Sequence, residues 1–202
     1  MRQVPDHLRS RTGRINFSRQ GPKASGLSHR SAGVSGVESP NMPRPTSESA
    51  RIADQLRRAF EGNAWHGPAL LELLDDVDAV TAAAKPLLEV HSIWELVLHI
   101  AAWDGAAYRR LGGEKIQLTG TANFPVVPKP TEAVWRKAVA HAKSAHDELV
   151  KTVTLLPESR LRDRVPGKKY DFYFMLHGVA QHELYHAGQI AILKKAESRR
   201  IL

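Results

Sequence analysis

The residues best suited to chemistry lie near the C-terminus, in the run His182-Glu183-Leu184-Tyr185-His186. His182 and His186 are four residues apart, so a helix would project both imidazoles from one face with about 6 Å between their Cβ atoms. Two imidazoles at this spacing can bind one metal ion. Glu183 follows the first histidine and is a candidate catalytic base, although its side chain is directed about 100° around the helix.

The same five residues match the H-E-x-x-H pattern of zinc proteases, in which the glutamate is the general base. Such proteases need a third metal ligand further along the chain. No histidine follows His186, and Glu197 is the only acidic side chain after it. No segment shows the period-two alternation of polar and apolar residues that is typical of strands. The sequence therefore does not favour a protease.

A third ligand is available upstream, where His99 lies in the middle of the apolar segment 93–103. A buried imidazole needs a partner, which either a hydrogen bond or a metal ion would supply. Metal sites in helical bundles are built from side chains on facing helices, so His99 joins His182 and His186 as a candidate metal ligand. Three histidine ligands without a fourth protein ligand leave a coordination position for substrate. A packing coincidence in a metal-free bundle stays open as an alternative.

The apolar periodicity predicts the helices that would position these residues. Ser92 and Glu95 form a capping box at the start of a helix over about 93–111, which is apolar nearly all round and therefore expected inside a bundle. The connection 112–130 contains three prolines and is long enough to run the length of a bundle. Further helices are predicted over about 48–61, from Pro68 to Leu74, over about 132–153 and over about 172–195. These elements indicate an all-α four-helix bundle.

Composition narrows the function further. The chain has 202 residues and no cysteine, which excludes a disulfide scaffold, a thiolate metal site and a cysteine nucleophile. Of the formal net charge of +8, most lies in residues 1–46, which hold eight basic and two acidic residues. The folded part is nearly neutral and lacks a clustered basic face, so nucleic acid is not an expected partner. No apolar run is long enough for a bilayer span, so no membrane partner and a cytoplasmic location are expected.

Residues 1–45 are rich in Gly, Ser, Pro and Arg, and we expect them to form a disordered basic tail. The predicted helical domain covers residues 46–202. Three origins of the tail fit its composition: a solvated extension, an organelle transit peptide, or residues upstream of a true start at Met42.

Two segments resemble the signature segments of the DinB/YfiT-like metal-binding superfamily: Ser92–Ile100 with Trp103, and Gly178–Ile190. The run Trp65-His66-Gly67-Pro68 is similar to a segment found in one branch, and the resemblance covers roughly residues 43–195. It implies a four-helix bundle with up-down-down-up topology, often assembled as a homodimer. It also implies a divalent metal ion, commonly zinc or nickel, held by three histidines that correspond to His99, His182 and His186.

Relatives with known chemistry include transferases and isomerases that use low-molecular-weight thiols. The resemblance therefore implies a metal-dependent enzyme that transfers or adds a thiol to a small-molecule electrophile, or performs a related hydrolysis. Because the chain has no cysteine, the thiol would be a co-substrate. The alternative function is a non-catalytic, metal-stabilised binding module of the stress-response type. A coordination position that opens into a pocket would favour the enzyme.

Several further residues could contribute to a site. Tyr185 and Asp171 could orient ligands or substrate, and His66 and His91 lie in loops that could border a pocket. Arg109, Arg110, Lys168 and Lys169 could receive a substrate carboxylate or could be solvated charges. His141 and His146 have no partner at ligand spacing, and we interpret them as surface or packing residues.

Overall fold

The structure, a computed structural model, describes residues 46–200, with the side chain of Arg200 left out. The regular secondary structure of these residues is helical, and they form no strand apart from one isolated bridge between Arg164 and Asp171. Its elements are α1 (Glu48–Phe60), α2 (Leu70–Leu74), α3 (Ala79–Ala83), α4 (Ile93–Leu111), α5 (Glu132–Thr154) and α6 (Phe172–Arg200), with short 3-10 turns at Gly120–Ala122 and Glu158–Arg162. The predicted tail, residues 1–45, lies outside the described residues.

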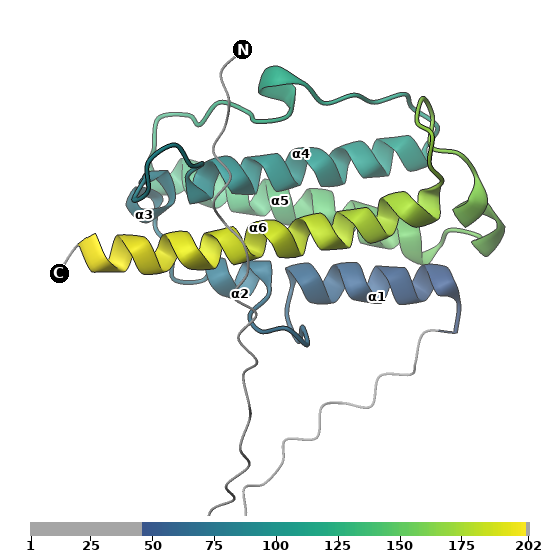
Figure 1. Ribbon diagram of the computed structural model, residues 1–202, viewed down its shortest axis with the longest axis horizontal. Helices are drawn as coiled ribbons and strands as arrows, with labels where there is room; N and C mark the ends of the chain where they lie inside the picture. Colours follow the sequence, from purple (N-terminus) through teal and green to yellow (C-terminus); the bar gives the residue numbers. More distant parts are fainter. Residues whose placement is uncertain (1–45, 201–202) are drawn as a thin grey trace, which may run out of the picture. The chain divides into compact units, whose positions relative to one another are not determined.

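The four long helices form a bundle in which α4 contacts α5 and α6, and α1 contacts the same two helices. Figure 1 shows that α4 and α5 run in one direction while α1 and α6 run in the other. This is the predicted up-down-down-up order, and the all-α bundle is confirmed. Because α4 and α5 are parallel, the connection 112–131 must return along the length of the bundle, and it does so on the outside of α4 (Figure 1).

Side-chain caps define where the long helices begin. The Ser92 hydroxyl accepts a hydrogen bond from the Glu95 N–H group at 3.2 Å, and the Glu95 carboxylate accepts one from the Ser92 N–H group at 2.6 Å. The predicted capping box of α4 is therefore present. Ser47 and Thr131 cap α1 and α5 in the same way through their hydroxyls.

Two boundaries differ from the prediction. Pro68 does not open α2, because the Glu72 carboxylate accepts a hydrogen bond from the Ala69 N–H group at 2.7 Å and makes Ala69 the N-cap instead. The helix predicted to end near residue 195 continues to Arg200. Lysines near a helix C-terminus favour the dipole but do not by themselves end the helix.

The interior of the bundle consists of two apolar clusters. One lies around Trp94 and Trp135, whose indole N–H group donates to the Val77 carbonyl oxygen at 2.6 Å. The other lies around Leu149 and Leu176. Helix α4 contributes to both clusters, which explains its nearly continuous apolar sequence. Between residues 46 and 200, no helix combines the length and the hydropathy that a membrane crossing requires.

Candidate metal centre

Three imidazoles meet between α4 and α6. The Nε2 atom of His182 lies 3.0 Å from Nε2 of His99 and 3.0 Å from Nε2 of His186. His182 and His186 come from consecutive turns of α6, as their spacing predicts, and His99 comes from the facing side of α4. His99 and His186 are buried, with 5% and 7% of their surface exposed, and His182 is partly exposed. The structure thus brings together all three histidines that the sequence selects as candidate ligands.

Hydrogen bonds to the outer nitrogens orient two of these rings. The Nδ1–H group of His99 donates to the backbone carbonyl oxygen of Asn123 at 2.7 Å, and the Nδ1–H group of His186 donates to Oε1 of Gln189 at 2.6 Å. A carbonyl oxygen can only accept, so each Nδ1 carries the proton and each Nε2 carries a lone pair. Partners of this kind hold metal-binding histidines in one tautomer and one orientation.

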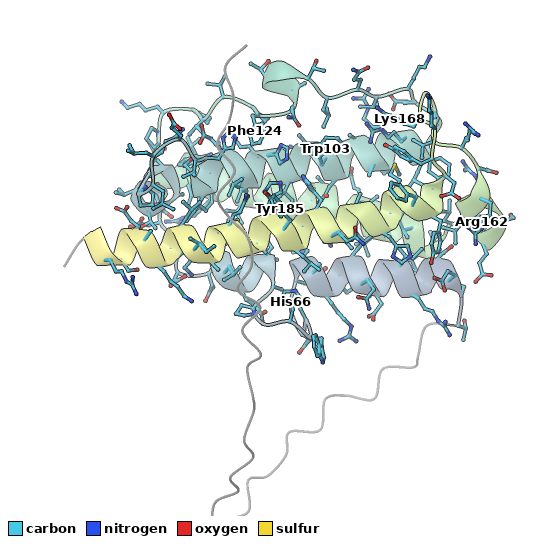
Figure 2. The ribbon with its side chains drawn as sticks, viewed as in Figure 1. His66, Trp103, Phe124, Arg162, Lys168 and Tyr185 are labelled. Atoms are coloured by element: carbon cyan, nitrogen blue, oxygen red, sulfur yellow. The ribbon has the colours of Figure 1, made fainter. Side chains whose placement is uncertain are left out.

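Aromatic rings pack beside His99, among them Phe124 of the long connection between α4 and α5. Phe124 stacks on the His99 ring with 4.0 Å between centroids, and the His91 ring stacks on the other side of Phe124 at 3.9 Å. The side chain of Asn123 accepts a hydrogen bond from the indole N–H group of Trp103 at 2.9 Å. Figure 2 shows Phe124 and Trp103 together on the α4 side of the bundle. Sequence reasoning did not select Asn123, Phe124 or Gln189.

Burial keeps these histidines uncharged near neutral pH. It lowers the pKa of His182 to about 3, with a further contribution from the neighbouring His186 and His99 rings. Burial also lowers the pKa of His99 and of His186, although the bonds to Asn123 and Gln189 partly oppose it. Neutral imidazole is the form that binds a metal ion.

The donor set fits a transition-metal ion. In the rings of His99 and His186, Nε2 is a hydrogen-bond acceptor, and both atoms lie 3.0 Å from Nε2 of His182. A neutral His182 ring has a single N–H group, which can donate fully to only one of these two acceptors. A metal ion among the three rings would be bound by all three nitrogens at once. Imidazole nitrogens are ligands for zinc, nickel, copper and iron alike. This cluster is therefore compatible with a metal site, and its three ligands leave a further coordination position.

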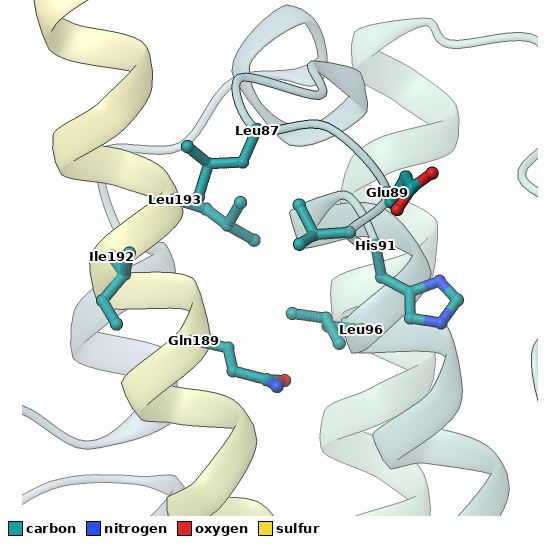
Figure 3. Close-up of a pocket in the computed structure, with 8 residues that line it drawn as sticks. Leu87, Glu89, His91, Leu96, Gln189, Ile192 and Leu193 are labelled. Carbon is teal, nitrogen blue, oxygen red and sulfur yellow. The ribbon is translucent and has the colours of Figure 1, made fainter. Parts of the chain in front are cut away.

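Two cavities lie beside the centre. One, of about 200 Å³, is bordered by His182 and Arg110 and by the aromatic rings of Trp103, Tyr170 and Phe174. The other, of about 350 Å³, lies between α4 and α6 and is largely apolar. Figure 3 shows Gln189, Ile192 and Leu193 of α6 on one side of the second cavity, with His91 and Leu96 on the other. The first cavity is the one that reaches a candidate metal ligand directly.

A second polar cluster lies inside the bundle, where Asp104 of α4, His146 of α5 and Glu183 of α6 meet, all with 0% exposure. The Nδ1 atom of His146 lies 2.9 Å from Oε1 of Glu183 and 3.5 Å from Oδ2 of Asp104. Burial opposes the charged imidazole, but the nearby Asp104 carboxylate and the hydrogen bond to Glu183 raise the pKa of His146 to about 9. Burial raises the pKa of Asp104 and of Glu183 as well.

This cluster corrects our interpretation of His146 and changes that of Glu183. His146 is not an isolated packing residue, because its partners come from two other helices. Glu183 lies beside His182 in the sequence, but its carboxylate is hydrogen-bonded to His146 and lies apart from the three imidazoles. A general base must reach the proton that it removes, and a fully buried carboxylate has no direct contact with a substrate cavity. The base role of Glu183 stays an untested prediction.

The remaining candidates lie at varied distances from the centre. His91 contacts the centre through Phe124. His66 is exposed in the connection between α1 and α2, away from Trp103 (Figure 2). Asp171 accepts a hydrogen bond from the Phe174 N–H group at 2.9 Å and so caps the N-terminus of α6. Tyr185 is 65% exposed, with its ring 5.1 Å from that of His186.

The two arginines at the end of α4 differ in environment. Arg109 is exposed and pairs with Glu114. Arg110 is 1% exposed, donates to the Ile116 carbonyl oxygen at 2.9 Å, and lies with its guanidinium carbon 5.5 Å from the centre of the Trp103 ring. Arg110 is thus a buried cation at the cavity that His182 borders.

Fold and site together define a helical-bundle protein with a three-histidine cluster suited to a metal ion. A family model described as the DinB superfamily matches residues 64–190, which include all three histidines. The chain belongs to this superfamily. No curated protein and no solved structure matches it.

Proposed function

We propose that this protein is a metal-dependent enzyme acting on a small molecule, with His99, His182 and His186 as the ligands of a zinc or nickel ion. The observation that carries the proposal is the convergence of three Nε2 atoms beside a cavity that His182 itself borders. An ion held by three protein ligands has a position left for substrate, and the cavity supplies the space for one. A coordination position that opens into a pocket favours an enzyme over a non-catalytic module.

The reaction we propose is the transfer or addition of a low-molecular-weight thiol to an electrophile, or a related hydrolysis. This chemistry is supported by the membership of the superfamily and by the resemblance described above. When bound, a divalent ion supplies Lewis acidity and lowers the pKa of the group that it binds. The chain has no cysteine, so the thiol is a second substrate.

The residues of the chain would bind and orient the substrate. Trp103, Tyr170 and Phe174 provide an aromatic wall for an apolar or planar body. Arg110 provides positive charge at the same cavity, where a substrate carboxylate or phosphate would be attracted. Asn123 and Gln189 hold the imidazoles of His99 and His186 in the orientation that binding requires.

Elemental analysis of the folded, full-length protein tests the metal centre. We expect one ion per chain that a chelator removes without unfolding, and that His182→Ala lacks. The matched control is His141→Ala, because His141 is an exposed histidine on α5 and its loss should leave the metal content unchanged. Equal metal contents in the two variants would contradict the proposed ligand set.

Turnover is tested separately, by pairing small thiols with electrophilic substrates and comparing the loaded protein with His182→Ala. Product formed only by the loaded wild-type protein would support the enzyme. A protein that holds its ion and shows neither thiol transfer nor hydrolysis would instead be the metal-stabilised binding module.

A further inference from the structure

The cluster of Asp104, His146 and Glu183 has the composition of a metal site of its own. It offers one imidazole nitrogen and two carboxylates, and its three ligand atoms all lie within 4.8 Å of one another. Each residue comes from a different long helix, and each has 0% of its surface exposed. None of the three is a ligand of the three-histidine centre in the proposed function.

The spacing of the donor atoms suits an ion. His146 Nδ1 lies 2.9 Å from Glu183 Oε1 and 3.5 Å from Asp104 Oδ2. Two ligand atoms that are each about 2.1 Å from an ion lie about 3.0 to 3.4 Å apart when they subtend about 90° to 109° at it. The observed separations therefore need little adjustment to place an ion among the three side chains.

Most of the carboxylate oxygens in this cluster accept no hydrogen bond from an N–H group. Within the described part of the chain, the single Nδ1–H group of His146 serves one oxygen, Oε1 of Glu183. Both oxygens of Asp104 and Oε2 of Glu183 are buried and accept no hydrogen bond from an N–H group. Without an ion, a proton on one of the two carboxyl groups is the donor available to them. Buried carboxylate oxygens without donors are costly, and a bound cation is one of the few partners that would satisfy several of them together.

The charges of the cluster favour a divalent ion. The ion pairs that the described residues give Asp104 and Glu183 are both with His146. One imidazolium balances only one of the two carboxylates, so the metal-free cluster is neutral when the second carboxyl group keeps its proton, in line with the raised pKa of Asp104 and of Glu183. A divalent ion bound by two carboxylates and a neutral imidazole also leaves no net charge, because it takes the place of two protons.

We propose that Asp104, His146 and Glu183 form a second metal site, which binds a divalent first-row transition-metal ion such as Zn²⁺ inside the bundle. The imidazole ligand favours a transition metal over Mg²⁺ and Ca²⁺, which prefer oxygen ligands alone. The ion joins α4, α5 and α6 and thereby stabilises the helices that carry the three-histidine centre. This site does not depend on the proposed function, because it shares no ligand with that centre.

Burial distinguishes the two sites by their exchange kinetics. His182 is partly exposed and borders a cavity, so an ion there can reach a chelator from the folded protein. Asp104, His146 and Glu183 have no exposed surface, so their ion can leave only when the bundle opens. The second ion is therefore acquired during folding and is retained by the native protein.

The experiment measures zinc per chain in full-length protein expressed with added Zn²⁺, before and after dialysis of the folded protein against a chelator. We expect two ions before dialysis and one after it. His182→Ala should hold one ion that dialysis does not remove. The near-isosteric variants Asp104→Asn and Glu183→Gln should hold one ion that dialysis does remove, and Asp147→Asn, an exposed neighbour of His146 on α5, should behave as wild type.

The wild-type protein decides the question even if the variants fold poorly, which circular dichroism would reveal. One ion per chain in the wild type, fully removed by native dialysis, overturns the second site while leaving the three-histidine centre supported. Two ions in the wild type with unchanged content in His182→Ala would overturn the histidine centre instead. A content of two ions in folded Glu183→Gln would also overturn the assignment of the buried ligands.

Discussion

The Nδ1–H group of His99 donates a hydrogen bond to the backbone carbonyl oxygen of Asn123 across 2.7 Å. This bond joins α4 to the long connection that follows it, and it leaves the lone pair of His99 Nε2 directed toward His182. The connection between two parallel helices is therefore part of the site. A backbone acceptor cannot be removed by substitution, so the corresponding bond of His186 offers the cleaner test.

Gln189→Leu removes the acceptor that Oε1 provides to the Nδ1–H group of His186. We expect the affinity of the three-histidine centre for its metal ion to fall by about 10- to 100-fold, because hydrogen-bond partners of ligating histidines contribute about that much. Competition with a chromophoric chelator measures the affinity. Gln181→Leu makes the same change at an exposed position of α6, and an equal loss there would contradict the role of Gln189.

Gly178→Leu tests the cavity beside His182. Gly178 borders this cavity, and a Cβ atom at its position would meet nothing within 4 Å, so the helix should accept the larger residue. We expect unchanged metal content and a loss of turnover of at least about tenfold, because the side chain would occupy the space that we assign to substrate.

Gly188→Leu is the matched control for this substitution. Gly188 lies on the same helix, is exposed and also has nothing within 4 Å of an added Cβ atom, but it does not border the cavity. Steady-state kinetics of both variants, with metal content measured in parallel, gives the comparison. Similar turnover in the two variants would exclude this cavity as the substrate site.

Acid should destabilise the metal-free protein through His182. Its pKa is lowered from 6.5 to about 3 in the folded state, so the unfolded chain binds the proton more readily. The stability that neutral His182 contributes is therefore present above pH 6.5 and is lost as the pH falls toward 3. Between pH 7 and pH 5 we expect the free energy of unfolding to fall by about 1–2 kcal/mol, after allowance for partial exposure.

Urea denaturation of chelator-treated protein at the two pH values measures this effect. His182→Ala should show a smaller fall than wild type, whereas His141→Ala should follow wild type because His141 is exposed. If wild type and His182→Ala lose stability equally, the low pKa of His182 is not the cause.

Ser92→Ala tests the cap that begins α4. The Ser92 hydroxyl accepts a hydrogen bond from the Glu95 N–H group, and Ser92 is only 2% exposed. We expect the free energy of unfolding to fall by about 1 kcal/mol, which is typical for loss of an N-cap, without a change in metal content. Ser144→Ala, at an exposed position within α5, should change the free energy of unfolding by less than about 0.5 kcal/mol. Chemical denaturation of both variants makes the comparison.

The sequence by itself determined the local structure, and it was enough to select the three histidines that meet between α4 and α6. Ser92 and Glu95 satisfy each other's backbone groups within one helical turn, so their pattern needs no distant partner. The spacing of His182 and His186 places both rings on one face of any helix that contains them. The apolar character of the segment around His99 showed that it would be buried, and a facing helix was then the natural place for its partner.

Only the tertiary structure decided what surrounds these residues. Asn123 and Phe124 reach His99 from a connection without regular periodicity, and Gln189 reaches His186 along the same helix face, where its position three residues later was a signal that could have been used. His146 and Glu183 are 37 residues apart in the sequence. Helix periodicity orders residues only over a few turns, whereas these contacts depend on how α4, α5 and α6 are packed, and that is set by the core as a whole.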